Sequence, residues 1–117
     1  MSIAKQLTDS LTIQRPTRVE TDYGYREDFA DLATVRGRIV QGGSGTSGVP
    51  VEATAGRDTI TVVAACYLPA GTDVTPLDRI RDNADDTVWQ VASPPTRITK
   101  GRRVLALQVA LRYTEDL

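Results

Sequence analysis

The sequence predicts an all-β fold, a small single-domain β-barrel of about six short strands with a long Gly-rich loop and little helix. Val, Ile and Thr make up 33 of the 117 residues, and these β-branched side chains favour a pleated strand over a helix. Short segments of alternating apolar and polar residues recur and end at Gly, Pro, Asn or Asp. Because no long helical pattern is present to cover a parallel sheet, a closed barrel is favoured over a two-layer α/β fold. Residues 1–117 are therefore expected to form one domain.

Two segments show the strongest strand patterns. Val104 to Tyr113 alternates from Leu105 onward, so that apolar side chains share one face while Gln108 and Arg112 fall on the other. Asp58 to Leu68 is apolar on one face and only partly polar on the second, which is typical of a central strand. Weaker patterns complete the expected set: Leu11–Arg15, Val35–Gln41, Asp78–Arg81, Thr87–Ala92 and a short extended piece around Ile98.

One turn and two short helices are also expected. Arg81 to Thr87 should form a hairpin turn, because Asp and Asn side chains mimic backbone turns and tolerate positive φ. Only Ile3–Leu7 and Asp28–Thr34 could hold a helix. In the second segment Asp28 would cap the helix, and Phe29, Leu32 and Ala33 would face the core.

Composition excludes most familiar catalytic chemistry. The chain has no His and one Cys, which removes His-based acid–base relays, His-containing metal sites, Cys–His nucleophiles and paired-cysteine motifs. Cys66 lies in the longest apolar stretch, Val62–Leu68, and is expected to be a buried core thiol. That stretch is far shorter than the ~20 residues of a membrane helix. Trp89 should be the largest core anchor. We expect no enzyme activity, cofactor, metal or membrane span.

The segment between Gln41 and Asp58 is unusually long and Gly-rich for a connection inside a compact domain, so it should be functional or disordered. Its Gly43 to Gly48 stretch matches a dinucleotide-binding fingerprint, but Val49-Pro50-Val51 follows and cannot open the helix that such a site needs. Two interpretations stay open: a flexible tip without a role, and a mobile loop that orders on meeting a partner or a second copy of the chain.

Two basic pieces are candidate interface segments, Arg36-Gly37-Arg38 and Lys100-Gly101-Arg102-Arg103. Arg outnumbers Lys twelve to two, and Arg suits bidentate contacts with carboxylates at protein interfaces. Nucleic-acid binding would instead need a basic groove with stacking aromatics. The net charge is −1 and no strand face carries an aromatic cluster, which favours a protein interface through Arg36, Arg38, Arg102 and Arg103.

Several short pieces follow one another in a set order along nearly the whole chain. They are Leu11–Arg15, Thr21–Tyr25, Val35–Ile39, Tyr67–Val74, Asp78–Ile80, Thr87–Val91, Ser93–Pro95 and Leu111–Tyr113. In this order and at this length, they resemble the siphophage head-closure family, the stopper or head-to-tail joining proteins of the viral neck. The chain departs from the family pattern at Asn83-Ala84-Asp85, where a turn glycine is usual.

The resemblance implies a structural subunit of a phage head-to-tail connector. Such a subunit forms a homo-oligomeric ring below the portal and its adaptor protein, closes the DNA-filled head, and docks the tail through a tail terminator or tail completion protein. It implies location in the virion neck, with host cytoplasm during assembly and only non-specific proximity to double-stranded DNA in the channel. The loop at 42–56 would gate that channel. The gating residues would be Gly42, Gly43, Gly45, Gly48, Val49, Pro50, Val51 and Gly56.

A second hypothesis comes from the residues alone. A small β-barrel could be an OB-like single-strand nucleic-acid-binding module that uses the two basic pieces.

Overall fold

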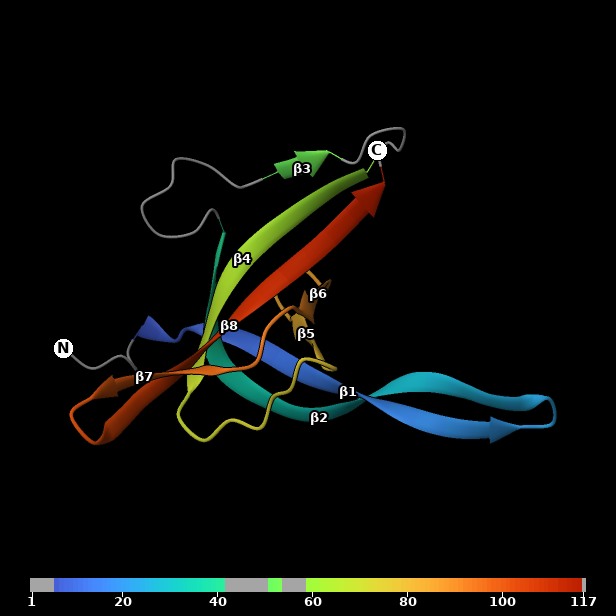
Figure 1. The fold of residues 1–117 in the computed structure, drawn as a ribbon, viewed down its shortest axis with the longest axis horizontal. Coiled ribbons are helices and arrows are strands. Elements are labelled where there is room, and N and C mark those ends of the chain that lie inside the picture. Colours follow the sequence, from blue (N-terminus) through green and yellow to red (C-terminus); the bar gives the residue numbers. More distant parts are fainter. Residues whose placement is uncertain (1–5, 42–50, 54–58, 117) are drawn as a thin grey trace.

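The computed structural model describes residues 6–41, 51–53 and 59–116 (Figure 1). The regular elements in these residues are strands, and no α-helix occurs among them. The strands are β1 (Asp9–Thr21), β2 (Gly24–Gln41), β3 (Val51–Ala53), β4 (Thr59–Pro69), β5 (Arg79–Asp82), β6 (Thr87–Val91), β7 (Thr96–Lys100) and β8 (Arg103–Asp116).

Six of these strands pair in a closed circuit, which confirms the predicted barrel. Strand β4 pairs with β2, β2 with β1, β1 with β5, β5 with β6 and β6 with β8, and β8 returns to pair with β4. Each pairing is antiparallel. Strands β3 and β7 extend the sheet by pairing with β4 and β8. Closure gives the barrel strands two hydrogen-bonded neighbours each, so the circuit presents no continuous open edge.

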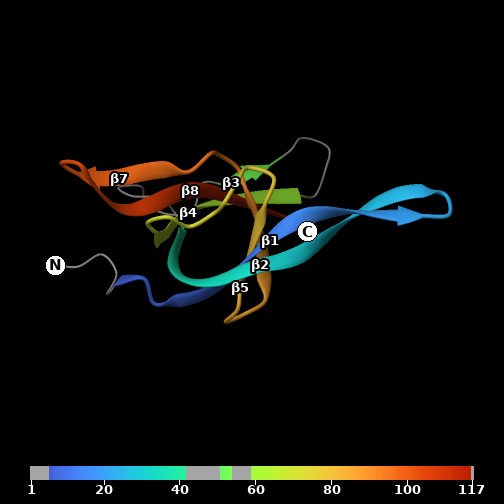
Figure 2. The same ribbon diagram turned by 90° about the horizontal axis from the view of Figure 1, so that it is seen from below.

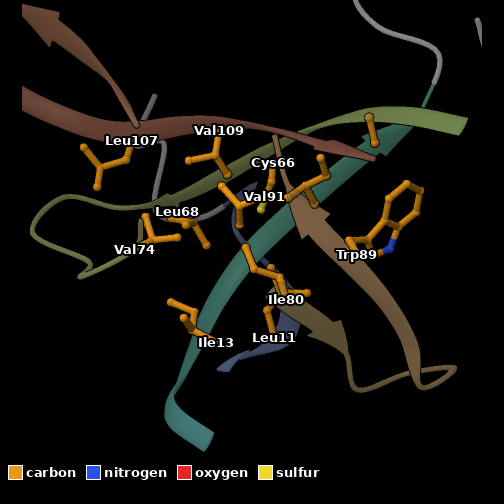
Figure 3. Close-up of a cluster of buried hydrophobic side chains, with 12 residues drawn as sticks. Leu11, Ile13, Cys66, Leu68, Val74, Ile80, Trp89, Val91, Leu107 and Val109 are labelled. Atoms are coloured by element: carbon orange, nitrogen blue, oxygen red, sulfur yellow. The ribbon is translucent and has the colours of Figure 1, made fainter. Parts of the chain in front are cut away.

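Apolar side chains fill the inside of the barrel (Figure 3). The alternation predicted for β8 holds, since Leu107, Val109 and Leu111 point inward while Arg112 is exposed. Trp89 is 3% exposed, and its ring centroid lies 5.7 Å from that of Tyr113. The remaining buried core residues come from four strands and from the segment before β5: Leu11, Ile13, Ala64, Cys66, Leu68, Val74, Ile80 and Val91.

The helix predicted over residues 28–34 is wrong, because these residues belong to β2. Phe29 and Leu32 are at least one-third exposed and lie outside the core. An amphipathic helix forms in a protein because its apolar stripe is buried, and here the barrel interior is already filled. Pairing with β1 satisfies the backbone instead. The other helix expected, over residues 3–7, lies mostly outside the described residues.

Strands β1 and β2 form a long hairpin, and only its near part pairs with other strands of the barrel. Its far part, residues 16–32, extends from the barrel and is called the arm below (Figures 1 and 2). The two strands meet at a two-residue connection between Thr21 and Gly24, where Gly24 has φ of 127°. At the base of the arm, the pairing register shifts by one residue at Leu32, which has no partner on β1. Such a bulge bends and twists the strand pair.

The turn predicted between β5 and β6 is confirmed. Strand β5 pairs with β6 so that Asp82 lies opposite Thr87, and Asp86 takes the positive φ, at 61°. Asp tolerates this left-handed conformation better than most residues other than glycine. The side chain of Asn83 also donates to Ser10 Oγ at 3.1 Å and Thr12 Oγ1 at 3.0 Å, which ties the turn to β1.

Gly37 marks the place where β2 changes partner. Up to this residue β2 pairs with β1, and from Arg38 it pairs with β4. A Cβ at position 37 would lie 2.6 Å from Leu11 Cδ1 and 2.7 Å from the carbonyl oxygen of Tyr67. Only glycine leaves room there for the core side chain and the neighbouring backbone, so this corner of the barrel requires it.

An ionic cluster fixes the segment that precedes β5. Arg15 of β1 donates to both oxygens of Asp78, at 3.0 and 2.9 Å. The Asp78 side chain is fully buried and also accepts the Thr75 amide at 2.9 Å. Arg15 bonds the exposed Asp73 as well, and these hydrogen bonds hold the pKa of Asp73 below its usual value. The cluster holds residues 73–78 against β1 at the base of the arm.

Replacing Gly37 with Ala should destabilise the domain by about 2 kcal/mol, because the added methyl overpacks a rigid corner. Chemical denaturation of the purified variant measures this change. Ala30→Ser, at an exposed position of the same strand, is the control and should change stability by no more than about 0.5 kcal/mol. Equal stability of the two variants would contradict the role of Gly37.

Asp78→Asn should lower the free energy of unfolding by about 2 kcal/mol, because it weakens charge-assisted hydrogen bonds at a buried carboxylate. Asp73→Asn removes the other negative charge that pairs with Arg15, but the Asp73 side chain is 70% exposed. Its effect on stability should be much smaller, since exposed ion pairs contribute little. Thermal unfolding of both variants at neutral pH provides the comparison. If Asp73→Asn lowers the stability more than Asp78→Asn does, the buried Arg15–Asp78 pair is not the main stabilising contact of the cluster.

Candidate functional site

The described residues contain no group of three or more His, Cys, Asp or Glu side chains that could hold a metal ion. Cys66 is fully buried, as predicted. Burial, together with the negative charges of Asp9 and Asp82, raises the pKa of its thiol to about 12, so the reactive thiolate is not formed at neutral pH. In the same part of the chain, no helix has the length and apolar character needed to cross a membrane.

The predicted gating loop falls mostly outside the described residues. Residues Gly42, Gly43, Gly45, Gly48, Val49, Pro50 and Gly56 lie outside them, whereas Val51 begins β3. Strand β3 pairs with β4 of the same chain. Val51, one of the predicted gating residues, is therefore a strand residue of its own barrel.

Strands β2 and β3 occupy neighbouring places on one edge of β4. The last pair of β2 joins Gln41 to Ala64, and the first pair of β3 joins Val51 to Val62. Only Val63 lies between these two partners on β4, whereas nine residues, 42–50, separate the two strands along the chain. One residue would be enough to continue the ladder. Eight of the nine residues in 42–50 are therefore an insertion that the sheet does not need.

The four candidate interface arginines lie in two places. Arg36 and Arg38 are exposed on β2, and Arg36 donates to the Thr8 carbonyl oxygen at 3.1 Å. Arg102 and Arg103 are exposed at the turn between β7 and β8. We call residues 96–103 the basic hairpin.

Arg38 and the basic hairpin line the same hollow. It is lined by Arg38 and Val40 of β2, Tyr67 of β4, Ile98 of β7, and Gln6 and Leu7. The structure thus places Arg38 at the same end of the molecule as Arg102 and Arg103, beside a partly apolar surface. Sequence spacing alone could not show this, because the strands involved are paired through β8 and β4.

The arm was not singled out by the sequence as a site, yet it carries most of the exposed large apolar side chains among the described residues. Tyr23, Tyr25, Phe29 and Leu32 are exposed on it, and Leu77 is exposed beside it. The guanidinium carbon of Arg18 lies 3.4 Å from the centre of the Tyr25 ring, a cation–π contact that orders this aromatic side chain. The sequence signal for this hairpin is the alternation of the β-branched residues Thr17, Val19 and Thr21 before the Asp22–Gly24 turn.

Comparison with known proteins gives one family and a related structure. No curated protein sequence matches the chain. A chain in the solved structure titled "Virion of native gene transfer agent (GTA) particle" has the same fold, with a TM-score of 0.69, 17% sequence identity, and coverage of 95% of this chain and 97% of that chain. The family model for the phage head completion protein matches residues 3–112. The chain therefore belongs to the phage head completion protein family.

Proposed function

We propose that this protein is a ring-forming subunit of a phage head-to-tail connector that closes the DNA-filled head and docks the tail. It is a structural virion protein by family. In this proposal it sits in the neck, below the portal and its adaptor protein, and meets a tail terminator or tail completion protein on its other side. It assembles from host cytoplasm and has no catalytic role.

The observation that carries the closing role is the insertion at 42–50. The ladder on β4 would continue across a single residue, yet the chain contains nine, of which four are glycines. Glycine lowers the cost of unusual backbone conformations but raises the entropy lost on ordering. A sequence of this kind is suited to a segment whose conformation is set by neighbouring subunits, which is what a channel gate in a ring requires.

The overall charge also suits a DNA conduit. The chain has a net charge of −1, so it lacks the excess of cations that makes binding to phosphates strong. A neck protein must let the genome pass, and dense phosphate contacts would slow its exit.

Deletion of residues 43–50 tests the gating role without disturbing the barrel. It leaves Gly42 opposite Val63 and Val51 opposite Val62, so the ladder stays in register. We expect the variant to fold and to enter particles, but the particles should lose their packaged DNA. Nuclease-protected DNA per particle is the measurement, after complementation of particles that lack the natural protein.

A matched variant keeps the length of the insertion and replaces residues 43–50 with a Gly/Ser sequence of eight residues. It separates the need for length from the need for Val49 and Pro50. If particles that carry the deletion retain DNA as well as unaltered particles do, the gating role of this segment is wrong.

A nucleic-acid-binding module remains the second hypothesis, because Arg38 and Tyr67 line one hollow beside the basic hairpin. A binding titration of the purified chain with single-stranded DNA at rising salt distinguishes the two functions. We expect no measurable binding at physiological salt. Affinity that is high and falls steeply with salt would favour the module over the connector.

A further inference from the structure

The two most extended parts of the molecule lie at opposite ends of its longest dimension. The principal extents are 52 × 36 × 25 Å. The tip of the arm is at one end, and the basic hairpin is at the other, in both views (Figures 1 and 2). Contacts between these two surfaces within one chain are therefore excluded, whereas a neighbouring copy could supply them.

The arm is acidic and aromatic. Residues 16–32 contain two arginines and five carboxylates, a net charge of −3. Pairing of Glu20 with Tyr25, and of Arg18 with Glu27, places these four side chains on one face of the arm. Tyr23 at the tip is fully exposed. Exposed tyrosines among charges are typical of interface anchors.

The opposite end is basic and hollowed. The basic hairpin contains three arginines, one lysine and no carboxylate, a net charge of +4. Beside it, the hollow is lined by Arg38 together with the apolar residues Val40 and Ile98. An acidic strand pair with an aromatic tip matches this end in both charge and polarity.

We propose that the arm of one subunit docks head to tail on the basic hairpin and the adjoining hollow of a second copy of this chain. Two different patches of the same molecule form this contact, so it is heterologous and can repeat around a closed ring. The carboxylates of the arm pair with the arginines of the hairpin, and a tyrosine of the arm enters the hollow. This inference depends on the proposed function in one respect: it assumes that the subunits form a ring.

The docking site adjoins the end of β2. Arg38 and Val40 line the hollow, and β2 ends one residue later at Gln41. Docking of an arm would hold the end of β2 in each neighbouring subunit.

Charge reversal tests this contact. The arm variant is Glu20→Arg/Glu27→Arg, and the hairpin variant is Arg97→Glu/Arg102→Glu/Arg103→Glu. Each places like charges at the contact and should reduce DNA-filled, tailed particles roughly tenfold or more in complementation. A chain that carries both sets of substitutions restores opposite charges at each contact and should recover most of the yield.

The control is Arg112→Glu, which reverses one exposed charge on β8 outside the arm and the basic hairpin; it should leave the yield unchanged. Circular dichroism of each purified variant checks that the barrel is folded. If both reversed variants assemble normally, or if the folded combined variant stays as defective as either parent, the arm does not dock on the hairpin. The second result would point to a different protein or to DNA as the partner.

Cross-linking gives an independent measurement. The chain has two lysines, Lys5 and Lys100, so a zero-length carbodiimide reagent can report the basic hairpin through Lys100 alone. We expect peptides in assembled particles that join Lys100 to Glu20, Asp22 or Glu27 of another copy. Absence of such peptides from assembled particles would overturn the contact. Neither result depends on whether deletion of residues 43–50 causes DNA loss, so the two proposals can fail separately.

Discussion

Closure of the sheet is the constraint on which the rest of this structure depends. Six strands pair in a circuit, and the circuit closes only if β2 leaves β1 and joins β4. The change of partner occurs at Gly37, where a side chain would collide with Leu11 and with the backbone of Tyr67. Once the barrel is closed, its interior is filled by aliphatic side chains from every barrel strand and by Trp89. The interaction surfaces that we propose therefore lie on the segments that extend beyond the barrel.

Two such segments stand out, and the fold separates them in space. The arm leaves one end and the basic hairpin leaves the other. Each is a hairpin whose two strands pair with one another outside the core. Selection can therefore change their length and charge with little effect on the stability of the barrel.

Contacts at the base of the arm fix its orientation relative to the barrel. The unpaired Leu32 bends the strand pair, and Arg15 joins β1 to the buried Asp78. Gln14 bonds Asp31 at 2.8 Å and accepts from Arg79 at 2.8 Å, while Arg79 lies over the Phe29 ring. These contacts set the direction of the arm relative to the barrel. A subunit contact made at the far end of a long hairpin needs such a rigid base, because small angular changes there become large displacements at the tip.

Local patterns in the sequence determined the strands and turns of the barrel. Alternation in residues 104–113, and the Asp- and Asn-rich turn after Ile80, reflect interactions between near neighbours, which a single sequence reports directly. The arm was missed because both of its faces are solvated, so no buried apolar face marks it. Phe29 and Leu32 also have a spacing that fits a short helix. The hollow could not be predicted at all, since Arg38, Tyr67 and Ile98 are brought together only by long-range strand pairing. The sequence reports the periodicity of each segment. Closure of the strand circuit decides which segments become neighbours in the barrel and which extend beyond it.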